Sequence, residues 1–176
     1  MNLDDRSFTT SALTAAAGCE PMTFRTWRNR NGLFPEVSGG RTWKRFTVVD
    51  VCVARAVAMM TSHGIAVGNA IAFAQNNLRS EIEDLLTGER GSSLVGFFVG
   101  GTKSDDLVAY ADESGNAQLS KQNARPEPPA SFVFLEDAAT LMDTVAKTKG
   151  ILTIIDLKAL AQHVVDVLEK RDPGNA

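Results

Sequence analysis

The chain has 176 residues, a length that suits one compact domain or one small domain with an appended part. Hydrophobic residues make up 44% and charged residues 22%, which is ordinary for globular proteins and argues against a wholly disordered chain. The net charge of −3, taken over the whole chain, argues against a nucleic-acid-binding protein, because such proteins usually carry a surplus of bases. The two cysteines and two histidines cannot form a structural zinc site of the usual kind. We expect two reduced thiols and no metal or other cofactor.

Charge differs between the two parts of the chain. Residues 1–79 hold nine bases and five acids, a charge of +4, whereas residues 80–176 hold nine bases and sixteen acids, a charge of −7. This asymmetry predicts that the first part can face a polyanion while the second keeps the chain soluble. No apolar run approaches the roughly 18–20 residues of a membrane span, and the first residues lack the pattern of a signal peptide. We therefore expect a cytoplasmic protein with no membrane partner.

The first part predicts short helices followed by a hairpin. Hydroxyl side chains precede an alanine-rich helix over 11–17, and Gly18 and Pro21 separate it from a second helix over 22–29. Two helices joined by so short a turn form a helix-turn-helix. Glycines between two extended segments then predict a small hairpin over 36–46, which would be a wing.

Two further helices are predicted before the sequence pattern changes to short strands. Thr47 is expected to cap a third helix that ends at His63 and Gly64, and a fourth helix is expected from 65 to about 86. Residues 88–93 are typical of a linker. The remaining predicted elements are strands at 94–99, 107–110, 117–119, 131–135 and 151–155, a turn at 112–116, a helix over 136–147 and a final helix capped by Asp156.

The predicted fold class is therefore α+β. A mostly helical winged helix-turn-helix domain, residues 1–87, is followed by a small α+β domain, residues 92–176, for dimerisation or regulation. The final helix carries an apolar stripe that could be core packing or a dimer seam. The stripe consists of Leu157, Leu160, Val164 and Leu168.

Residues 25–45 carry a charge of +5, because six bases are opposed by Glu36 alone. A helix fits the major groove of DNA, arginine binds guanine or phosphate through two hydrogen bonds, and cations on a wing neutralise phosphates. A charged helix can also be a merely solvated face, and either tryptophan can belong to the core. We predict a double-stranded DNA interface. Its predicted residues are Thr23, Arg25, Trp27, Arg28 and Arg30 on the second helix and Arg41, Thr42, Trp43, Lys44 and Arg45 on the wing.

A series of motifs follows the same order. They are Phe8-Thr9-Thr10, Ala17-Gly18-Cys19, Thr23-Phe24-Arg25-Thr26-Trp27, Gly32-Leu33-Phe34-Pro35, Gly40-Arg41, Lys44-Arg45-Phe46-Thr47, Asp50-Val51 and His63-Gly64-Ile65. This stretch, from Phe8 to about Gln75, resembles the winged helix-turn-helix of the MerR family of transcriptional regulators. The resemblance implies that Arg25, Trp27, Arg41 and Arg45 touch DNA. The family usually has Tyr in place of Trp27, and its long dimerisation helix is stopped here by residues 88–93, so effector binding and metal sensing are not carried over.

We expect a sequence-specific transcriptional regulator, most simply a repressor that occludes its operator as a homodimer formed through the second domain. No nucleophile–base arrangement is visible, so the chain is not expected to be an enzyme. One alternative is an architectural DNA-binding protein, such as an excisionase or a phage packaging adaptor. Another is a ligand-sensing or enzymatic second domain coupled to DNA binding. The sequence does not define a small-molecule effector.

Overall fold

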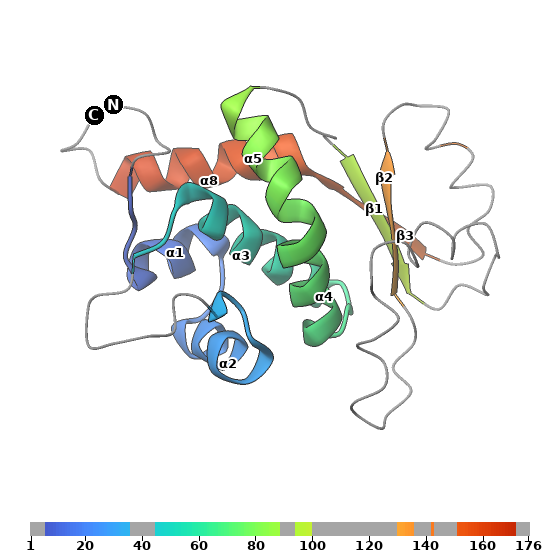
Figure 1. Ribbon diagram of the computed structural model, residues 1–176, viewed down its shortest axis with the longest axis horizontal. Coiled ribbons are helices and arrows are strands. Elements are labelled where there is room, and N and C mark those ends of the chain that lie inside the picture. The colour runs from blue at the N-terminus through green and yellow to red at the C-terminus, as the bar shows by residue number, and fades with distance from the viewer. Residues whose placement is uncertain are drawn as a thin grey trace. The chain divides into compact units, whose positions relative to one another are not determined.

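The computed structural model describes residues 6–35, 45–88, 94–99, 130–135, 142 and 151–171. The described part is mostly helical with a small antiparallel sheet (Figure 1). The chain forms two compact units, one made of Met1–Gly91 with Leu157–Ala176 and the other of Ser92–Asp156. We call them the helical unit and the inserted unit. The inserted unit therefore lies, in sequence, within the helical unit.

The first two helices of the helical unit form the predicted helix-turn-helix. Helix α1 (Thr10–Ala17) begins after Thr9, whose hydroxyl accepts a hydrogen bond from the Ala12 backbone, and α2 (Pro21–Asn31) begins with proline in its first turn. Between them Gly18 adopts the left-handed conformation, with φ of 67°, as the sequence predicted. Both helices run slightly longer than expected.

Helix α3 (Val48–Ser62) forms the centre of the helical unit. Its start is a capping box: the Thr47 hydroxyl accepts from the Asp50 backbone N–H, and the Asp50 carboxylate accepts from that of Thr47. Thr47 was the predicted cap. The helix is buried on most sides and packs against α1 and against the helices that follow. Its buried side chains therefore form the central part of the core against which α1 packs.

The single helix expected over 65–86 is three helical pieces. They are α4 (Val67–Phe73), a turn of π-helix η3 (Ala74–Leu78) and α5 (Arg79–Thr87). A π-turn accommodates an extra residue within a helix and changes which side chains face the core. Gly88 ends α5 with a φ of 76°, in agreement with the predicted stop.

The final helix, α8 (Leu157–Arg171), packs with the helical unit. It contacts α1, α3 and α5, and Figure 1 shows it beside α1 and α3. The stripe that could have been a dimer seam is buried in these contacts, which favours the core-packing alternative. The buried residues are Leu157, Leu160, Ala161, Val164 and Leu168. Residues 157–171 were expected in the second domain, and this packing places them with the first part of the chain instead.

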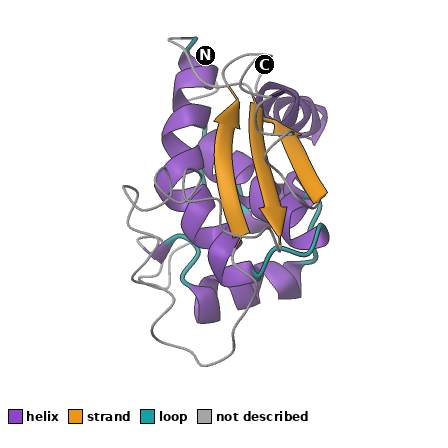
Figure 2. Cartoon of the chain, turned by 90° about the vertical axis from the view of Figure 1, so that its right-hand side faces the viewer, coloured by secondary structure: helices purple, strands orange, loops and turns teal. Residues whose placement is uncertain are grey.

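The described part of the inserted unit is an antiparallel sheet with the strand order β2-β1-β3 (Figure 2). The strands are β1 (Leu94–Val99), β2 (Ala130–Leu135) and β3 (Ile151–Asp156), close to three of the predicted strands. Val95 pairs with Ile155 across β1 and β3, and both side chains are buried. At the end of the same ladder Leu94 pairs with Asp156, so the chain enters and leaves the sheet at neighbouring positions.

Several predicted elements lie outside the described residues. They are residues 36–44 of the wing expected over 36–46, the strands at 107–110 and 117–119, the turn at 112–116 and the helix over 136–147 apart from Met142. Within the described ranges, no helix combines the length and apolar character that a bilayer crossing requires.

Candidate nucleic-acid interface

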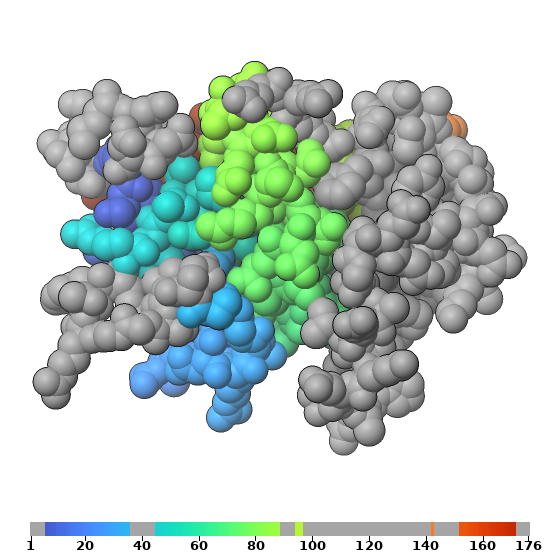
Figure 3. Space-filling model, viewed as in Figure 1, coloured from blue at the N-terminus to red at the C-terminus, as the bar shows by residue number. Residues whose placement is uncertain are grey.

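Helix α2 has two chemically distinct faces. Phe24 and Trp27 are buried, whereas Met22, Arg25 and Thr26 are exposed. At about 3.6 residues per turn, positions 22, 25, 26 and 29 share the side of the helix opposite to positions 24 and 27. The helix contains three arginines and no acidic residue. Its outward face is therefore polar and cationic, and Figure 3 shows α2 in light blue at the surface of the helical unit.

The turn that leads into α2 is fixed from α3. Arg55 donates from Nη1 to the Ala17 carbonyl oxygen at 3.2 Å, which satisfies the end of α1. A Cβ added to Gly18 would lie 2.5 Å from the same Nη1 atom. The left-handed backbone favours glycine, and a side chain here would displace the Arg55 guanidinium. A guanidinium of α3 thus binds the carbonyl at the end of α1, next to the turn.

The exit from α2 is held by the π-turn. Gly32 has a φ of 73°, and Phe34, which is buried, has a φ of 54° that side-chain-bearing residues rarely adopt. The Phe34 backbone N–H donates to Gln75 Oε1 at 2.7 Å, and Gln75 Nε2 donates to the Gly32 carbonyl oxygen at 3.4 Å. One side chain of η3 therefore binds both sides of the loop that ends α2.

An aromatic cluster lies beneath α2. The rings of Phe24, Phe34 and Phe46 have centroid separations of 5.6 to 6.4 Å in tilted or edge-to-face arrangements. The Arg28 guanidinium lies over the Phe46 ring, 5.6 Å from its centroid. This contact ties the Arg28 side chain to the aromatic cluster.

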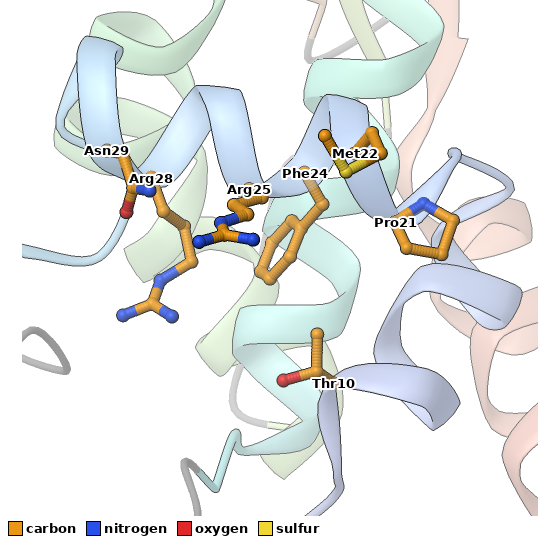
Figure 4. A pocket seen from close by; sticks show the side chains of 7 residues that line it. All are labelled: Thr10, Pro21, Met22, Phe24, Arg25, Arg28 and Asn29. Atoms are coloured by element: carbon orange, nitrogen blue, oxygen red, sulfur yellow. The ribbon is translucent and has the colours of Figure 1, made fainter. Parts of the chain in front are cut away.

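A surface depression of about 470 Å³ lies beside α2. Figure 4 shows Arg25 and Arg28 extending from the same side of α2, with Thr10, the first residue of α1, across from them. The remaining lining residues are Pro21, Met22, Phe24 and Asn29. Two guanidinium groups on one rim make this hollow electropositive, which suits the approach of a phosphate backbone.

The segment that follows the predicted wing, residues 45–50, is bound both to residues 7–8 and to the start of α5. Phe46 and Phe8 exchange two backbone hydrogen bonds of 2.7 and 3.0 Å, and Arg45 donates to the Ser7 carbonyl oxygen at 3.2 Å. The buried Asp50, 4% exposed, forms an ion pair with Arg79 at 2.8 Å. Arg79 and Gln75 are four residues apart, so η3 and the start of α5 together bind both the exit of α2 and the residues after the wing.

The structure describes six of the ten predicted interface residues. Thr23, Arg25 and Arg30 are exposed on α2, Arg45 is exposed beside Ser7, and Arg28 is half-buried. Trp27 is 6% exposed and packs in the core, the alternative that the sequence left open for the two tryptophans. Arg41, Thr42, Trp43 and Lys44 lie outside the described residues.

Three residues of the outward face were not among the predicted interface residues. They are Met22, Thr26 and Asn29. The signal that could have found them is helical periodicity, since they lie at positions i, i+4 and i+7 opposite the apolar pair Phe24 and Trp27. Residue type alone, without the direction in which each position faces, does not identify them.

The two thiols are free, as expected from the sequence. Burial raises the pKa of Cys52 to about 12. Burial, with a smaller contribution from the Glu20 carboxylate, raises the pKa of Cys19 to about 11. Both thiols are therefore protonated and weakly nucleophilic near neutral pH. Among the residues with described positions, no group of three or more His, Cys, Asp or Glu side chains is arranged to hold a metal ion.

No protein-family model matches the chain, and a search of curated proteins found no significant relative.

Proposed function

We propose that the helical unit binds double-stranded DNA sequence-specifically, with α2 in the major groove, and that the protein is a transcriptional regulator. The observation that carries this proposal is the outward face of α2, which presents Arg25 and other polar side chains and has no carboxylate to repel phosphates. Helix-turn-helix proteins place such a helix in the groove, with its N-terminal residues at the base edges. The acidic second part of the chain is consistent with selective binding, because it limits non-specific attraction to phosphates.

Repression by occlusion is the mechanism we favour, since a bound helical unit covers promoter DNA without further chemistry. This mechanism places the protein in the cytoplasm. We further propose that a homodimer binds, because two copies of the motif double the base contacts. The α8 stripe is buried within one chain, and we propose that the dimer contact comes from the inserted unit.

The direct test begins with selection of bound duplexes from a random library, followed by measurement of affinity by fluorescence anisotropy. Arg25→Ala should weaken binding to the selected sequence roughly 5- to 150-fold, the cost of losing one base-contacting arginine. Arg171→Ala is the matched control, because it removes the same exposed side chain from the end of α8. Equal affinity of the two variants would contradict the placement of α2 in the groove.

The oligomeric state is tested by the same selection. A homodimer predicts an inverted repeat whose half-sites are centred about one helical turn, or a multiple of it, apart. Sedimentation at tens of micromolar should then give a species of twice the chain mass. A single unrepeated half-site together with a monomer in solution would contradict the dimer and leave DNA binding itself intact.

A further inference from the structure

The side chain of Met22 is 70% exposed at the second position of α2. Within the described ranges only two other large apolar residues are exposed, Met142 at 68% and Ile154 at 41%, and both belong to the inserted unit. Met22 is thus the large apolar side chain that the described part of the helical unit leaves in solvent. Its thioether contributes little to the core.

The neighbours of Met22 define what it can meet. Arg25, Thr26 and Asn29 share its side of α2. The Thr26 hydroxyl donates to the Met22 carbonyl oxygen at 3.0 Å, so its hydrogen is committed within the helix. Asn29 and Arg25 carry the groups that bind adenine and guanine edges. Met22 is therefore the apolar side chain of an otherwise polar stripe. It lies in the N-terminal turn of α2, the part of a recognition helix that reaches the base edges.

We propose that Met22 is a specificity-determining residue that packs against the C5-methyl group of a thymine in the major groove. The inference rests on the proposed function and deepens it. Thymine is the base that presents a methyl group on the floor of the major groove, and a flexible, polarizable thioether adapts well to such a contact. The proposal predicts that the selected sequence has a thymine opposite the N-terminal turn of α2.

The experiment removes the thymine methyl group from the DNA and the Met22 thioether from the protein, first separately and then together. Each thymine of the selected duplex is replaced in turn by deoxyuridine, which lacks only the C5-methyl group. Affinities are measured for the wild-type protein, Met22→Ala and Met142→Ala. At one position, deoxyuridine should weaken wild-type binding about fourfold, the value expected for one buried methyl. The same replacement should leave Met22→Ala unaffected, whereas Met142→Ala should respond like the wild type.

The outcomes separate this inference from the function on which it rests. If the selection yields no preferred duplex, the proposed DNA binding fails. If a duplex is selected but every deoxyuridine replacement acts equally on wild type and Met22→Ala, DNA binding stands and the methyl contact is overturned. A selected sequence without thymine overturns it as well. Alanine favours helices, and circular dichroism should show unchanged helix content in Met22→Ala.

Discussion

Replacing Gln75 by leucine is expected to loosen the loop at the C-terminal end of α2. The substitution keeps the size of the side chain and removes both the acceptor for the Phe34 N–H and the donor to the Gly32 carbonyl oxygen. The Phe34 N–H then lies next to a buried ring without its 2.7 Å partner, and an unsatisfied buried donor costs about 1–3 kcal/mol. The contact at 3.4 Å adds little. We therefore expect a loss of about 1–3 kcal/mol in the free energy of unfolding.

Urea denaturation followed by circular dichroism measures this loss. With a slope of about 2 kcal/mol/M, the midpoint should fall by about 0.5–1.5 M. Gln75→Glu is the matched control, because its carboxylate still accepts from the Phe34 N–H. Its second oxygen faces the Gly32 carbonyl oxygen in place of a donor, so its midpoint should lie between those of the leucine variant and the wild type. Leucine and glutamate variants with equal midpoints would refute the reasoning, since they would show that the Phe34 hydrogen bond does not stabilise the fold in solution.

Three further changes have definite expected results. Gly18→Ala should lower the free energy of unfolding by more than Gly32→Ala, and denaturation midpoints measure the difference. Alanine at either positive φ costs about 1–2 kcal/mol, but only at Gly18 does its Cβ also displace the Arg55 guanidinium. Alkylation by iodoacetamide should be slow at pH 7 and accelerate as the pH approaches 11 for Cys19, with Cys52 slower throughout; rapid labelling of Cys52 at neutral pH would contradict its burial. Replacing residues 95–155 by a two-residue hairpin turn should preserve cooperative unfolding of the helical unit, whereas removing α8 should abolish it, because α8 buries five apolar side chains; calorimetry distinguishes the two.

The local features of the helical unit could be read from the sequence because they depend on near neighbours. Threonine before an apolar run predicts a cap, and Thr47 forms one. Glycine after an alanine-rich run predicts a left-handed helix end, and Gly18 has that conformation. The helix-turn-helix followed from these signals alone. The wing of the proposed interface, including Arg41 and Lys44, stays a prediction.

Features that depend on distant parts of the chain could not be read in the same way. The π-turn at Ala74–Leu78 places Gln75 against a loop more than forty residues earlier, and no local pattern marks such a partner. The apolar stripe of α8 is equally compatible with a core and with a dimer seam, and only packing on α1 and α3 distinguishes them. The burial of Trp27 follows from the same three-dimensional context.

The pairing of Leu94 with Asp156 has a thermodynamic consequence for the helical unit. When the roughly 65 residues of the inserted unit are unfolded, docking of α8 closes a long flexible loop. When the sheet is folded, the ends of that loop are already adjacent, and closure resembles that of a loop of about four residues. The difference in chain entropy is about 2.5 kcal/mol. Stabilising the sheet would therefore favour the docked α8, and with it the helix-turn-helix, through the chain connection alone.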